Sequence, residues 1–179
     1  LVLPHYDVPG RICALKIIGR KGDPSGDVLF KTVLKKRQAT EAGLSGHPSV
    51  LKSEGDTIFA FSDYAVGTRL QMRHMGMNPN PLQIVLWHKD DRHESKNCWN
   101  MLGHRKVVVC SESFTADAVL QAIHCDGRFS LISNIDYGQP SKTLERAEDK
   151  SAYWPDAFNS FAETATDSEL EEFVYRLPD

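Results

Sequence analysis

Basic side chains gather at the start of the chain, where they could bind phosphate groups. The first 37 residues carry eight basic and three acidic residues, a net charge of +5. Lysine and arginine neutralise phosphates and release the counterions that a nucleic acid holds, so a basic lobe favours a nucleic-acid partner. The alternative is a solvated surface without a partner, because the charges are loosely clustered. The residues expected to make the contact are Arg11, Arg20, Lys21, Lys35, Lys36 and Arg37.

A polar segment in the middle of the chain holds residue types that can ligate zinc. His88 and His93 are followed by Cys98, which places imidazole and thiol groups within eleven residues. A fourth ligand at close spacing is missing, so we expect a polar surface loop over residues 88–97 rather than a metal site. The four cysteines form no C-x-x-C pair, which disfavours a disulfide framework and favours a reducing, cytoplasmic location.

The three tryptophans are Trp87, Trp99 and Trp154. An exposed indole can stack on nucleic-acid bases. Large apolar side chains are more commonly part of a core, so we expect core positions and keep base stacking as the alternative.

Four short apolar segments predict the strands that would position these groups. Apolar runs separated by amphipathic helical stretches are typical of parallel strands buried on both faces and covered by helices. In such sheets the functional groups lie beyond the carboxyl ends of the strands. Polar residues follow at those ends, at Ser62-Asp63, His88, Ser111-Glu112-Ser113 and Ser133-Asn134. The expected strands are Ile58–Phe61, Ile84–Leu86, Val107–Cys110 and Leu131–Ile132.

The remaining segments predict an appendage at each end of this sheet. Residues 11–20 and 28–34 are rich in β-branched residues and flank a Gly-, Pro- and Asp-rich turn, which predicts a β-hairpin lobe. The C-terminal residues predict helices interrupted at Pro140 and Pro155, with Asp167 as the N-cap of the last one. The expected units are residues 1–55, an N-terminal β lobe with a connecting loop, 56–137, the α/β domain, and 138–179, an acidic helical segment.

Composition and charge narrow the class of protein. The 179 residues are 41% hydrophobic and 25% charged, which is typical of a globular domain. No apolar run reaches the ~20 residues of a membrane span, so no membrane partner is expected. Residues 136–179 carry four basic and eleven acidic residues, a net charge of −7. Because the first residue is not Met, we expect a piece of a longer protein.

The start of the chain resembles a known family. Residues 3–12 read Leu-Pro-His-Tyr-Asp-Val-Pro-Gly-Arg-Ile, and Gly19-Arg20 follow. This is similar to the opening of the catalytic core of bacterial DnaG-type DNA primases, where Pro-x-x-Asp-x-x-Gly-Arg leads into a strand ending in Gly-Arg. Residues 58–65 and 107–116 resemble the two strand-turn-helix segments of the Toprim fold, shared by primases, topoisomerases and related nucleases. The resemblance covers roughly residues 1–137 and implies a Toprim-like parallel sheet flanked by helices.

The resemblance also implies where a metal site would lie. In the family a Glu followed by Gly ends the first strand, an Asp-x-Asp ends the second, and these carboxylates hold divalent metal for phosphoryl transfer. Here Ser62 and Asp63 stand at the first place, and Glu112 and Phe114 at the second. A phenyl ring cannot bind Mg²⁺, so we interpret the site as degenerate.

Three functional hypotheses follow from these residues. The leading one is a primase-derived module of a larger replication or mobile-element protein. It would engage DNA, an RNA–DNA hybrid, or a replication partner such as a helicase, and would need no cofactor. The second is an active primase or nuclease using Mg²⁺ or Mn²⁺, with Glu112 and Asp63 as catalytic residues and with Asp136 or Asp117 completing the metal site. The third is a scaffold that docks partners through its acidic C-terminal helices, residues 163–172.

Overall fold

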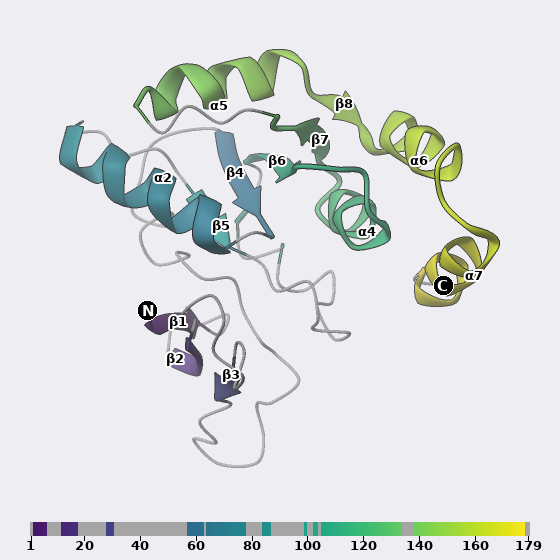
Figure 1. Ribbon diagram of the computed structural model, residues 1–179, viewed down its shortest axis with the longest axis horizontal. Coiled ribbons are helices and arrows are strands. Elements are labelled where there is room, and N and C mark those ends of the chain that lie inside the picture. Colours follow the sequence, from purple (N-terminus) through teal and green to yellow (C-terminus); the bar gives the residue numbers. More distant parts are fainter. Residues whose placement is uncertain are drawn as a thin grey trace.

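The computed structural model describes ten stretches of the chain. They are residues 2–6, 12–17, 28–30, 57–62, 64–77, 84–86, 99, 102–103, 105–133 and 138–177. Two sheets lie within them, and Figure 1 shows the smaller one apart from the larger. In the described part of the chain, no helix combines the length and the apolar character that crossing a membrane requires.

The smaller sheet is antiparallel and has the order β1-β2-β3. Its strands are β1 (Val2–Tyr6), β2 (Ile12–Ile17) and β3 (Val28–Phe30). The pairing of β2 with β3, in which Leu15 lies opposite Phe30, confirms the predicted hairpin. Strand β1 pairs with the other side of β2 and was not singled out by the sequence.

The larger sheet has five strands in the order β5-β4-β6-β7-β8. Its first four strands pair in parallel, which confirms the predicted sheet. The fifth strand pairs antiparallel with β7 and was not predicted. The strands are β4 (Thr57–Phe61), β5 (Ile84–Leu86), β6 (Lys106–Ser111), β7 (Arg128–Leu131) and β8 (Ala152–Tyr153).

The described residues include five helices, and these flank the sheet (Figure 1). They are α2 (Tyr64–Met77), α4 (Ala116–His124), α5 (Pro140–Asp149), α6 (Trp154–Ala162) and α7 (Asp167–Arg176). Pro140 and Pro155 occupy the first turns of α5 and α6, where a missing N–H costs no hydrogen bond. The predicted N-cap of α7 was wrong by one residue. Thr166 is the cap, because its hydroxyl accepts from the Glu169 N–H and the Glu169 carboxylate accepts from the Thr166 N–H.

Side chains alternate between the two faces of each strand, and helices cover both faces of the larger sheet. Ile58 and Ala60 of β4 belong to a core cluster that α4, α6 and α7 cover. Phe59 and Phe61 point to the opposite face, into a second cluster that α2 and α5 cover. The core thus consists of two layers of apolar side chains with the sheet between them.

Trp99 belongs to the first of these layers. It is buried, and its Nε1 donates a 2.8 Å hydrogen bond to Oε1 of the buried Gln121. A buried indole N–H needs such a partner. Trp99 is therefore a core residue, as expected. Trp154 is partly buried against the same cluster, and Trp87 lies outside the described residues.

Candidate functional site

The carboxyl edge of the sheet between β4 and β6 is the candidate site. The two strands are parallel neighbours, with Phe61 opposite Cys110, so Ser62 and Ser111 lie side by side where the strands end. After β4 the chain enters α2 on one face of the sheet, and after β6 it enters α4 on the other. Open α/β sheets bind ligands at such a reversal of winding, because the two loops diverge and leave a crevice.

The described polar groups at this edge are few. Ser62 is half-buried directly after β4, and Glu112 is exposed directly after β6. Asp63 and Asp136, the other expected metal ligands, lie outside the described residues, so the set of Glu112, Asp63 and Asp136 stays a prediction. Within the described ranges, no group of three His, Cys, Asp or Glu residues could hold a metal ion.

Phe114 stands where the resemblance predicts a second carboxylate, and its half-buried ring packs against the core. It stacks on the ring of Phe129 with 4.7 Å between centroids and 22° between ring planes. Phe129 lies on the neighbouring strand β7 and is fully buried. Stacking of this kind adds to the area that the two rings bury. The position thus supports packing and cannot supply a metal ligand.

Asp117, the alternative metal ligand, is bound by another helix. It lies in the first turn of α4, and its Oδ1 is 2.6 Å from a guanidinium nitrogen of Arg176 on α7. The first turn of a helix favours a carboxylate, since the N–H groups there carry partial positive charge. Both side chains are less than one third exposed, so solvent screens this pair less than an exposed one. Asp117 thus anchors α7 in this structure, and its role as an alternative metal ligand stays a prediction.

Two thiols among the described residues are chemically quiet. Burial raises the pKa of Cys110, at the end of β6, far above that of a free thiol. Burial likewise raises the pKa of Cys125, after α4, to about 12. Only the thiolate is a good nucleophile or metal ligand, so neither cysteine serves such a role near neutral pH.

The expected phosphate-binding residues lie outside the described residues. They are Arg11, Arg20, Lys21, Lys35, Lys36 and Arg37. The expected polar loop 88–97 and the zinc alternative within it also lie outside.

Sequence reasoning missed the pairing of Asp117 with Arg176. Only the acidic first turn of α4 and the basic last turn of α7 hinted at it.

Comparison with known proteins identifies the fold. No protein-family model matches the chain, and no curated protein matches its sequence. Among solved structures, the chain is similar to the catalytic core of the E. coli primase, with a TM-score of 0.62 and 13% identity. That match covers 99% of this chain and 64% of the E. coli core.

Two further structures show the same fold. One is a DnaG primase catalytic domain bound to single-stranded DNA, with a TM-score of 0.61, 13% identity, and coverage of 97% of this chain and 61% of that one. The other is a DnaG catalytic core, with a TM-score of 0.59, 11% identity, and coverage of 98% and 61%. The chain spans less than two thirds of the length of each of these structures. Its fold is Toprim-like and similar to that of the primase core.

Proposed function

We propose that this chain is a primase-derived, Toprim-like module that engages nucleic acid within a larger replication or mobile-element protein and has lost metal-dependent catalysis. The observation that carries the loss of catalysis is the ring of Phe114, which packs on Phe129 where the family has a carboxylate. Ser62 supports the same conclusion at the end of β4, because a hydroxyl is a weaker Mg²⁺ ligand than a carboxylate. A cytoplasmic location belongs to this proposal and is supported by the unpaired thiols of Cys110 and Cys125.

Nucleic-acid engagement is supported by the likeness to a primase domain solved with single-stranded DNA and by the net charge of +5 on the first 37 residues. Phosphate contacts made by lysine and arginine would supply the affinity and make it fall with salt. The partner would be DNA or an RNA–DNA hybrid.

Replacing Lys35, Lys36 and Arg37 together by alanine should weaken binding to a single-stranded oligonucleotide and flatten its salt dependence. Three lost phosphate contacts lower the slope of log K against log salt by about 2, at ~0.7 per contact on a single strand. Fluorescence anisotropy over a salt series measures both quantities. A matched control is the triple alanine variant at three exposed basic residues, Lys142 and Arg146 on α5 and Lys150 directly after it. An unchanged slope and affinity in the first variant would assign residues 35–37 to a solvated surface.

The competing enzymatic function requires a metal held by Glu112, Asp63 and Asp136. The exposure of Glu112 favours this alternative, since its carboxylate is accessible at the sheet edge. Loss of two carboxylates relative to the family pattern weakens the Coulombic attraction for a cation that already binds water strongly. We propose that the chain has no resident metal.

Titration with Mn²⁺ in a calorimeter should give no saturable heat at millimolar metal. Primer synthesis and DNA cleavage by the isolated chain should likewise not depend on Mg²⁺ or Mn²⁺. The decisive variant is Glu112→Ala, with Asp126→Ala as a control at an exposed carboxylate in the turn after α4. Saturable binding that Glu112→Ala abolishes and Asp126→Ala leaves intact would restore the enzymatic function.

A second candidate role is docking of a protein partner, such as a helicase, through the acidic C-terminal helices. The observation that favours it is the composition of residues 151–177, which include six acidic residues and one basic residue, Arg176. This segment repels nucleic acid and suits a positively charged protein.

A further inference from the structure

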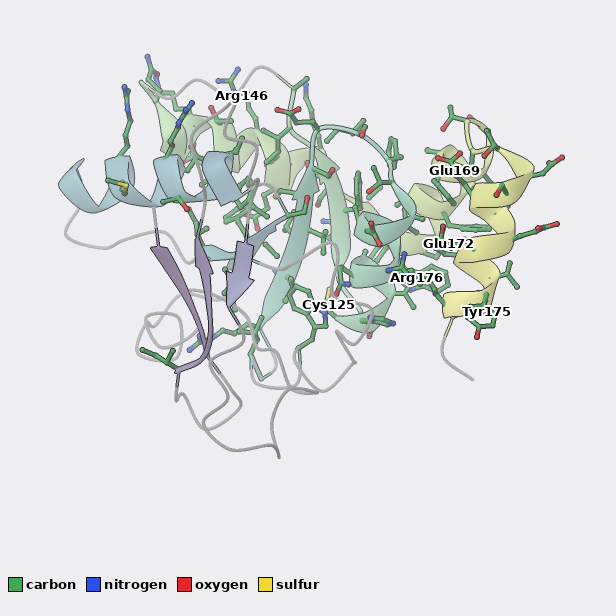
Figure 2. All side chains as sticks on the ribbon, turned by 60° about the horizontal axis from the view of Figure 1, so that its bottom comes forward. Cys125, Arg146, Glu169, Glu172, Tyr175 and Arg176 are labelled. Atoms are coloured by element: carbon green, nitrogen blue, oxygen red, sulfur yellow. The ribbon has the colours of Figure 1, made fainter. Side chains whose placement is uncertain are left out.

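The outward side of α7 exposes apolar side chains beside acidic ones. Tyr175 is 91% exposed, Val174 is 64% exposed, and Leu177 follows at 39%. Glu171 and Glu172, one turn earlier, are also exposed. We call these five residues, of which Leu177 is the C-cap that follows α7, the α7 outer surface. Figure 2 shows Tyr175 at the free end of the helix, away from the sheet.

The inward side of α7 is fixed to the domain. Phe173 is buried, and its ring lies 5.3 Å from that of Phe158 and 5.5 Å from that of Phe161 on α6. Arg176 binds Asp117 of α4. The first turn is closed by the capping box of Thr166 and Glu169. The helix is therefore a preorganised platform, which lowers the entropic cost of binding a partner.

The charge of this platform selects the chemistry of its partner. Arg176 is the one basic residue within 151–177, and the carboxylate of Asp117 neutralises it. The α7 outer surface itself carries the negative charges of Glu171 and Glu172 and no positive charge. Phosphate backbones and anionic lipid surfaces are repelled by such a field, whereas lysine- and arginine-bearing segments are attracted.

We propose that the α7 outer surface binds a basic amphipathic helix of a protein partner, an inference that rests on the docking role proposed above. The apolar stripe of the partner would cover Tyr175 and Val174, and its lysines or arginines would lie beside Glu171 and Glu172. Tyrosine is enriched among the residues that dominate binding energy, because it buries a large rigid area at low entropic cost. The recognition mode is helix against helix, with Val174 and Tyr175 as the apolar contacts and the two glutamates one turn earlier as the charged ones.

The test uses a fluorescein-labelled synthetic helix of 18 residues with leucines on one face and lysines on the other. A scrambled peptide of the same composition serves as the control for charge alone. The amphipathic peptide should bind the whole chain at least about tenfold more tightly than the scrambled one, a difference equivalent to about 1.4 kcal/mol. Equal affinity for both peptides in fluorescence anisotropy would overturn the proposal, since charge alone would then explain the binding.

Variants locate the binding to α7. The double variant Val174→Ser with Tyr175→Ser should weaken binding of the amphipathic peptide about tenfold, because it removes the apolar anchors. Met72→Ser on α2, where Met72 is 66% exposed, is the matched apolar control and should leave binding unchanged. The double variant Glu171→Gln with Glu172→Gln should reduce the dependence on salt, whereas Glu145→Gln with Asp149→Gln on α5 should not. Equal losses in test and control variants would place the binding elsewhere and refute the proposal.

Two parallel measurements keep the outcomes distinct. Binding of the oligonucleotide reports the nucleic-acid role separately, so its failure leaves the peptide result intact, and the reverse also holds. If peptide binding is retained by the α7 variants but lost on changes elsewhere in residues 138–179, docking survives while this surface is wrong. Sedimentation of the free chain tests whether a second copy of this chain occupies the surface. A concentration-dependent dimer that Tyr175→Ser abolishes would assign the surface to a second copy and overturn the proposal.

Discussion

Phe114→Asp is expected to lower the free energy of unfolding by about 2–4 kcal/mol. The change removes a stacked ring and places a carboxylate beside the fully buried ring of Phe129. The ring of Phe129, 4.7 Å away, would lose its aromatic partner. Urea denaturation followed by circular dichroism measures the change. We therefore expect a carboxylate at position 114 to cost the chain much of its stability.

Phe114→Leu is the control for this effect. It keeps an apolar side chain against Phe129 and should cost about 1 kcal/mol. Ser62→Glu tests whether the end of β4 tolerates a carboxylate. Ser62 is half-buried at the sheet edge, where the longer side chain can reach solvent. A urea midpoint for Phe114→Asp equal to that of the unmodified chain would mean that the position tolerates a metal ligand after all.

Phe173→Ala should destabilise the chain by about 3–5 kcal/mol, the usual cost of deleting a fully buried aromatic side chain. Phe173 is 1% exposed and contacts the rings of Phe158 and Phe161. We expect α7 to lose its attachment first, since this ring is its principal anchor. Hydrogen exchange of the α7 amides, combined with urea denaturation, measures the local and the global effect.

Tyr175→Ala supplies the comparison on the same helix. Its ring is 91% exposed, so the free energy of unfolding should change by no more than about 0.5 kcal/mol. The two aromatic residues therefore separate the roles of α7. Phe173 should control stability and Tyr175 should control peptide binding. Comparable destabilisation by both variants would contradict this division.

Much of the larger sheet could be predicted from its sequence because local and tertiary requirements agree. Runs such as Val107–Cys110 are continuous in apolar character, and parallel strands with both faces covered require that pattern. Helix α4 carries its own N-cap, Thr115, so the signal for its beginning lies in the adjacent sequence. The position of Glu112 at the carboxyl end of β6 followed from the same reasoning.

Other features depend on partners that are distant in sequence. Strand β8 has two residues and pairs with Arg128 and Phe129, a length that offers no period to recognise. The ion pair between Asp117 and Arg176 joins residues that are 59 positions apart in the sequence (176 − 117). That Phe114 packs on Phe129 depends on the neighbouring strand, and sequence pattern alone showed only that a ligand was missing.

The brevity of the strands at the two borders of the larger sheet affects how this protein can associate. Strand β5 has three residues at one border, and β8 has two at the other. An edge strand can pair with a strand of another molecule through its unpaired N–H and C=O groups. Strands of two or three residues offer few such groups. At the β8 border, the guanidinium of Arg128 lies over the ring of Tyr153, 4.9 Å from its centroid, and adds bulk and charge there. Within the described residues these borders offer few backbone groups for edge-to-edge pairing, so we expect association to involve the helices that surround the sheet.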